Sequence, residues 1–316
     1  MPLKQPVRFD PSVEQVQSDE SETIRDLESS FKQILDTTSE DYGHGVRSVH
    51  AKAHGIAKGT LTVKDGLPPE LAQGLFARPG SYDAVIRIST NPGDILDDSI
   101  SVPRGLALKV IGVEGERLPG SEGDVTQDFI MVNGPTFSAP DAKAFGKNLK
   151  MLAGTTDKAE GGKKLLSGIL QGVNAALSTV GIESPTIQQM GGAPNTHPLG
   201  ETYWSQTPFR YGDHIAKFQL VPVSAALTQL TGDTVSTSGR PDALRAVVNE
   251  VLTVQGGTWE LRVQLNRDLD AMPVEDPTQE WKEEDSPFQT VAVLEVPHQP
   301  SWVHGDSDTL DDRLSY

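Results

Sequence analysis

The chain has 316 residues, of which 36% are hydrophobic and 22% charged, so it can bury a full core as one large domain or two small ones. Its formal net charge of -17 would repel polyanions, which argues against nucleic acid or an anionic membrane as the main partner. It has no cysteine, which excludes disulfides, thiolate metal sites and iron–sulfur ligation. We therefore expect a small-molecule substrate, with any metal chemistry left to His, Asp, Glu, Tyr or a prosthetic group.

Nothing in the sequence predicts export or membrane insertion. Residues 1–21 carry charges and prolines where a secretory signal peptide needs an uninterrupted apolar run. No stretch of about 18 apolar residues occurs in the sequence, so no membrane span is expected. These features favour a cytoplasmic protein.

A helical segment and four strands are predicted in the first part of the chain. Apolar side chains follow a helical spacing over residues 12–38, after Asp10 and Pro11, which suit a cap and a first turn. Four runs with β character come next, each bounded by Gly, Pro or Asp: residues 59–63, 82–90, 105–113 and 127–133.

Helices and a second group of strands are predicted in the rest of the chain. Helical spacing returns over residues 138–154, 161–181 and 240–254, and strand patterns cover residues 202–212, 214–222, 258–265 and 290–297. Two groups of four strands without regular βαβ alternation favour an α+β fold, an eight-stranded antiparallel β-barrel with N-terminal and inserted helices. A β-sandwich is the alternative.

We expect a single domain over residues 1–316. Its predicted parts are an N-terminal helical arm (1–40), a first half-barrel (41–137), a helical insertion (138–200), a second half-barrel (201–300) and a C-terminal tail (301–316).

Basic and titratable residues gather in the sequence RSVHAKAHG, which begins at Arg47 and leads into a predicted strand. Alternation along the strand would place His50, Lys52 and His54 on one face. Their spacing does not match a zinc site, and alone it favours solvated side chains at a strand entrance. That face would nonetheless be unusually polar for a strand with a structural role only.

Arg87 interrupts the apolar run V-I-R-I-S-T. A buried arginine is costly without an anionic partner, so either Arg87 faces solvent or a negative group waits inside. Ser89 is predicted to share its face. Asn133, at the end of a later strand, is followed by Gly and Pro, which indicates a turn, although an amide that binds a ligand would look the same.

Four motifs follow one another within residues 43–140: R-x-V-H-A-K-x-x-G-x-x-x-G, V-I-R-I-S-T, P-R-G-L-A-L-K and Q-D-F-I-M-V-N-G-P-T-F. Further on, Y-W-S-Q-T-P-F-R-Y-G-D and S-P-F-Q-T-V-A continue the series. Their order and spacing resemble the haem catalases, and most closely the shorter catalase-related proteins, which share an eight-stranded antiparallel barrel.

The resemblance implies ferric haem b as the cofactor and hydrogen peroxide or an organic hydroperoxide as the substrate. His50 would be the distal histidine that moves a proton between the two peroxide oxygens. Asn133 would hold the peroxide, and Ser89 would orient the imidazole.

The resemblance also assigns residues that contact the cofactor. Arg47 and Arg87 would pair with the haem propionates, which would supply the anion that Arg87 lacks. Val49 and Phe137 would line the haem pocket. Val49 is the residue type of catalases, whereas the related allene oxide synthase domains have Thr there.

The iron ligand is the one part of the resemblance that is missing. Catalases hold the iron through a tyrosine, on a C-terminal helix with an arginine four residues before it. No C-terminal segment of this chain has that spacing, since Arg313 and Tyr316 are three residues apart and Arg210 and Tyr211 are adjacent. We expect a chain truncated before the proximal tyrosine; alternatively, another tyrosine takes its place or haem is not bound in the usual way.

Three functions fit these observations. The first is a haem-dependent enzyme that decomposes peroxide. The alternatives are a non-catalytic haem-binding or structural relative and an enzyme that transforms fatty-acid hydroperoxides. The resemblance also allows a homo-oligomer.

Overall fold

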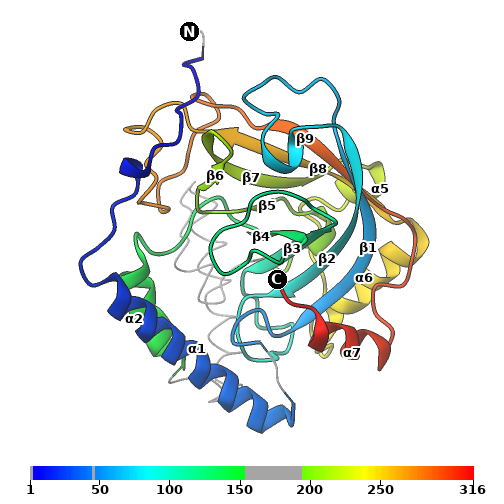
Figure 1. Cartoon of the computed structure of the whole chain (residues 1–316). Coiled ribbons are helices and arrows are strands. Elements are labelled where there is room, and N and C mark those ends of the chain that lie inside the picture. The colour runs from blue at the N-terminus through cyan, green and yellow to red at the C-terminus, as the bar shows by residue number, and fades with distance from the viewer. Residues whose placement is uncertain (1–2, 45–46, 154–193) are drawn as a thin grey trace, which may run out of the picture.

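The computed structural model of the chain describes residues 3–44, 47–153 and 194–316, and its strands close into a barrel (Figure 1). The strands are β1 (Ala53–Val63), β2 (Gly80–Thr90), β3 (Arg104–Ile111), β4 (Thr126–Val132), β5 (Tyr203–Trp204), β6 (Phe209–Tyr211), β7 (His214–Pro222), β8 (Gly257–Leu265) and β9 (Gln289–Val296).

All strand pairings in the described part of the chain are antiparallel. The order is β5-β4-β3-β2-β1-β9-β8-β7-β6, and an additional pairing of β5 with β7 closes the ring. Closure runs through β5 alone, in which Trp204 pairs with Val132 of β4 and Tyr203 pairs with Leu220 of β7. The predicted eight-stranded antiparallel barrel is confirmed.

The prediction of one strand over residues 202–212 is wrong. The structure breaks it into β5 and β6, which pair in succession with β7. Between them Gln206 has a left-handed φ of 59°, and its side-chain amide donates to the carbonyl oxygens of Gly134 and Thr136. A left-handed residue ends the extended backbone of a strand, and Pro208 supplies no N–H for the ladder.

Helices lie outside the barrel. They are α1 (Glu20–Tyr42), α2 (Ala142–Ala153), α5 (Ala225–Thr228), α6 (Ala243–Val254) and α7 (Asp306–Arg313), with short 3₁₀ helices at Pro11–Val13, Gly74–Phe76 and Pro198–Gly200. The predicted first helix therefore starts too early: Asp10 caps a 3₁₀ turn, and the long helix begins at Glu20. The predicted helix at 161–181 lies outside the described residues. Among those residues, no helix has both the length and the apolar character to cross a membrane.

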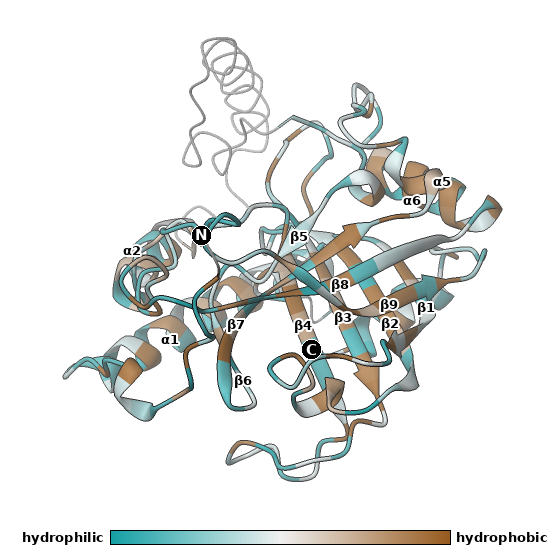
Figure 2. Ribbon diagram, turned by 90° about the horizontal axis from the view of Figure 1, so that it is seen from above, coloured by the Kyte–Doolittle hydropathy of each residue, from teal (hydrophilic) through white to brown (hydrophobic). Residues whose placement is uncertain are grey.

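Strand alternation separates the barrel interior from the surface that carries the site. Ile86 and Ile88 of β2 belong to the main hydrophobic core, together with residues of every long strand, whereas Arg87 and Ser89 face the other way. Figure 2 shows these hydrophobic residues as brown segments along the strands. Outside, α1 packs against α2 through a smaller cluster around Ile34.

Candidate functional site

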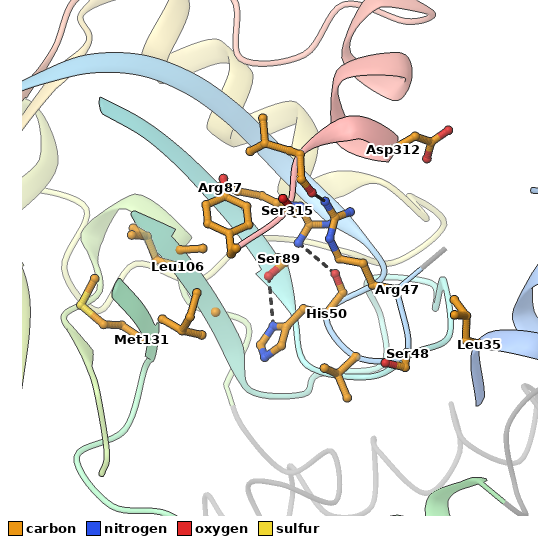
Figure 3. A pocket seen from close by; sticks show the side chains of 16 residues that line it. Leu35, Arg47, Ser48, His50, Arg87, Ser89, Leu106, Met131, Asp312 and Ser315 are labelled. Atoms are coloured by element: carbon orange, nitrogen blue, oxygen red, sulfur yellow. Dashed lines mark hydrogen bonds between the residues drawn. The ribbon is translucent and has the colours of Figure 1, made fainter. Parts of the chain in front are cut away.

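A cavity of about 490 Å³ lies on the outer face of β2, β3 and β4, closed by residues 47–50 on one side and 312–316 on the other (Figure 3). Arg87 is register-paired with Ala107, which is paired in turn with Ile130, so these side chains share the face that lines the cavity. Much of the wall is apolar, with contributions from Leu35, Val49, Leu106, Ile130 and Met131.

His50 enters this cavity from a turn and not from a strand. Its φ of 53° is left-handed, and β1 begins only at Ala53. The expectation that His50, Lys52 and His54 share one strand face is therefore wrong. The strained backbone is held on both sides, because His50 N–H donates to the Asn91 carbonyl at 2.7 Å and the His50 carbonyl accepts from Arg87 at 2.9 Å.

The imidazole of His50 is fixed by contacts on two sides. Its Nδ1 is 3.0 Å from Ser89 Oγ (Figure 3). A Cβ built on Gly105 would lie 2.5 Å from His50 Cε1, so the ring packs where only a glycine leaves room. Burial, together with the charges of Arg87 and Arg47, lowers the pKa of His50 to about 4, which makes the ring neutral at pH 7.

Arg87 is buried, and its anionic partner is in the chain itself. Asp311 of α7 accepts from Arg87 Nε at 2.6 Å and from Arg47 at 2.9 Å. Arg47 also donates to the main-chain carbonyls of Asp311 and Leu314. The negative group that Arg87 required is therefore Asp311, while the pairing of either arginine with a haem propionate stays a prediction.

Tyr316 places a phenol in the same cavity. It is among the lining residues, and its hydroxyl is buried without a hydrogen-bond partner in the described part of the chain. Burial raises the pKa of Tyr316 above its ordinary value. The spacing R-x-x-x-Y does occur once in the sequence, at Arg78 and Tyr82, but Tyr82 lies on strand β2 and not on a helix.

The fold of the chain is similar to that of solved catalase structures. Catalase A from Saccharomyces cerevisiae has a TM-score of 0.53 and 16% identity, with 94% of this chain and 58% of that chain covered. A fungal catalase has a TM-score of 0.55 and 16% identity, with 95% and 57% covered. The chain has the catalase fold.

The likeness to these catalases is structural and covers only part of them. A bacterial catalase gives a TM-score of 0.52 at 16% identity, with 94% of this chain and 55% of that chain covered. The chain thus spans a little over half the length of these catalases. No protein-family model and no curated protein matches the sequence.

Two residues expected to belong to the catalase-type pocket are not among those that line the cavity. Asn133 is not among the residues that line it; its Oδ1 accepts from Arg104 N–H at 2.8 Å and its Nδ2 donates to Glu201 at 3.0 Å. Phe137 does not line it either, and its ring lies 5.1 Å from that of Phe145. Their assigned roles stay predictions, whereas Val49 does line the cavity.

Lys52 and His54 are buried and are not among the residues that line the cavity. Lys52 is buried, 2.8 Å from Asp98 and 3.2 Å from Asp242. His54 is fully buried with neither ring nitrogen hydrogen-bonded, and burial lowers its pKa well below the usual range. Among the described residues, no group of three or more His, Asp or Glu is placed to hold a metal ion.

The sequence analysis missed two residues that shape the cavity. A glycine within a strand pattern signals a close approach, and Gly105 carried that signal without being recognised. Asp311 could not be identified, because it pairs with Arg87 across 224 residues of sequence.

Proposed function

We propose that this chain is a catalase-related protein that binds haem in the cavity and decomposes hydrogen peroxide or an organic hydroperoxide. One observation carries the proposal. The neutral imidazole of His50 and the buried, unpartnered phenol of Tyr316 line the same cavity of about 490 Å³ on a catalase-fold barrel. An imidazole supports proton transfer, and a tyrosine is the residue type that holds haem iron in catalases.

The residues present fit a haem group. The cavity volume of about 490 Å³ lies within the usual range for cofactor sites, roughly 300–1,000 Å³, and much of its wall is apolar. Tyr316 would hold the iron through its orphaned hydroxyl, and Arg47 and Arg87 are the cations available to propionates. Since burial raises the pKa of Tyr316, the phenolate needs the positive charge of the metal.

Haem, when bound, supplies the two-electron redox chemistry that peroxide decomposition requires. The part of this chain is proton transfer at His50. In the tautomer whose Nδ1–H donates to Ser89 Oγ, Nε2 is the nitrogen that accepts a proton from one peroxide oxygen and returns it to the other. The depressed pKa of His50 keeps that nitrogen available as a base at neutral pH.

The proposal is tested by titrating the purified protein with haemin. We expect a Soret band that saturates at one haem per chain and a peroxide turnover that His50→Ala reduces by about 10²–10⁴-fold. Tyr316→Phe should change the ligand-sensitive bands of the bound haem, whereas Tyr82→Phe, outside this cavity, should leave them unchanged. Absence of a Soret band at any haemin loading would refute the proposal.

A second function is a haem-binding protein without peroxide turnover. It is favoured by the hydrogen bonds of Asn133 with Glu201 and the Arg104 backbone, which engage both polar atoms of its side chain. Haem-loaded protein that shows a full Soret band but no peroxide consumption would support this function over the first.

A further inference from the structure

Residues near the C-terminal end of the described chain form one wall of the cavity, and an ion-pair cluster at Asp311 holds them in place. Asp311 on α7 presents its carboxylate to Arg47 and Arg87, and its side chain is only 13% exposed. We infer that Asp311 is an internal carboxylate that occupies the place of a ligand carboxylate at these two arginines, and so sets the preference of the cavity between acidic and neutral ligands.

Most donors of the two arginines are engaged in this state. Arg87 binds both carboxylate oxygens of Asp311, through Nε at 2.6 Å and Nη2 at 3.2 Å, and its Nη1 and Nη2 also donate to the carbonyls of His50 and Ala51. Arg47 binds Asp311 Oδ1 at 2.9 Å and two main-chain carbonyls. A ligand carboxylate therefore finds no free guanidinium edge on Arg87 unless Asp311 moves.

No second carboxylate of α7 is placed to take over this role. Asp312, the next residue, points away from the arginines (Figure 3), and its carboxylate lies 3.4 Å from His44 Nδ1. Two guanidinium groups thus share one carboxylate, and the cluster retains one net positive charge. An acidic ligand is attracted by that charge but must displace Asp311 to pair with Arg87, whereas a neutral ligand is neither attracted by the charge nor required to displace Asp311.

The displacement would also move the wall of the cavity. Arg47 binds the Asp311 and Leu314 carbonyls, and Leu314 packs against the cluster that contains Trp302. Tyr316 follows two residues later and lines the cavity. Release of Asp311 would therefore loosen the segment 311–316, including Tyr316, where it lines the cavity.

The inference rests on the proposed haem site, and it is tested with haemin and haemin dimethyl ester, which differ in their two carboxylates. We compare the wild-type chain, Asp311→Asn and the control Asp306→Asn, which removes the same charge at the exposed opposite end of α7. Asp311→Asn should raise haemin affinity by about tenfold or more relative to the ester, because a charge-assisted hydrogen bond no longer has to be replaced. Asp306→Asn should leave that ratio within about twofold, the scale of a screened surface charge.

Hydrogen exchange of the ligand-free proteins gives a reading that does not need haem. Asp311→Asn should accelerate exchange over residues 306–316 more than Asp306→Asn does. Equal exchange in Asp311→Asn and wild type, or an unchanged haemin-to-ester ratio where both bind, overturns the inference. Faster hydrogen exchange over residues 306–316 in Asp311→Asn alone, with neither porphyrin bound, would support the role of Asp311 in fixing this segment. It would instead refute the proposed haem function.

Discussion

His50 combines a strained backbone with a ring that has almost no freedom to move. Its φ of 53° is uncommon for a residue other than glycine, and it is held by hydrogen bonds to Asn91 and Arg87. Ser89 and Gly105 then fix the imidazole. Strain of this kind persists only where the surrounding structure imposes it, and it is concentrated at functional sites.

Gly105 gives a direct test of this packing. Gly105→Ala would place a methyl group 2.5 Å from His50 Cε1, so the ring must turn away from Ser89. We expect a loss of about tenfold or more in peroxide turnover of the haem-loaded protein, since a misplaced catalytic group costs rate even when the fold is kept. Gly123→Ala, at a position with open space and no left-handed φ, is the matched change. Turnover equal to wild type in Gly105→Ala would contradict this role.

The protonation of His50 predicts an unusual pH profile. Because its pKa is lowered from 6.5 to about 4, by burial first and then by the two arginines, the ring stays neutral at mildly acidic pH. Its C–H resonances in an NMR titration should move near pH 4 and not near 6.5. A His50 transition near 6.5 would show that the ring is solvated.

At the scale of elements, periodicity predicted regular segments well and interruptions poorly. The predicted strand at 214–222 is β7 to the residue, because its flanking turns and its alternating side chains agree. The break at Gln206 escaped prediction, since its left-handed backbone depends on amide contacts with Gly134 and Thr136, some 70 residues away. Arg47 and His50, which belong to one motif, line the same cavity. Their neighbour Asp311 was not predicted, because it pairs with Arg47 and Arg87 only in the folded chain.

Lys52 joins three elements behind the site. Its buried ammonium group lies beside Asp98 and also donates to the carbonyls of Leu96 and Pro241. These contacts tie the loop after β2 to the start of α6. Asp98 in turn accepts from Leu244 N–H in the first turn of α6 at 2.7 Å. The entry to β1, and with it His50, is anchored by this cluster.

Lys52→Met should destabilise the fold by about 3–5 kcal/mol, the usual cost of leaving one partner of a buried ion pair alone. Lys58→Met removes an exposed lysine from the following strand, β1, and should change the free energy of unfolding by less than about 0.5 kcal/mol. Urea denaturation measures both. The double change Lys52→Met with Asp98→Asn should recover part of the lost stability. Equal destabilisation by Lys52→Met and Lys58→Met would exclude a stabilising role for the cluster.

At the scale of the molecule, stability is coupled to several buried neutral histidines. Burial lowers the pKa of His50 and His197 to about 4 and holds that of His54 well below its ordinary value. Below pH 6.5 the unfolded chain takes up protons that the folded chain does not. The stabilisation is therefore complete above pH 6.5 and is lost as the pH falls toward 4.

We expect the free energy of unfolding to drop between pH 7 and pH 5 by up to about 2 kcal/mol for each such histidine. Urea midpoints across this range measure the slope. His197→Asn removes one proton-linked group and should make the slope shallower, whereas replacement of the exposed His304 should not. A slope that is identical in His197→Asn and wild type would contradict the coupling.

The place of β1 in the barrel has a consequence for synthesis of the chain. β1 pairs with β2 along one edge, but its other edge, Thr60 to Val63, pairs with β9, which begins only at Gln289. At ribosomal rates of about 5–20 residues per second, that edge waits roughly ten seconds or longer for its partner. An unpaired strand edge recruits other chains during such a delay. Crowded polysomes and fast overexpression should therefore favour aggregates that nucleate at this edge.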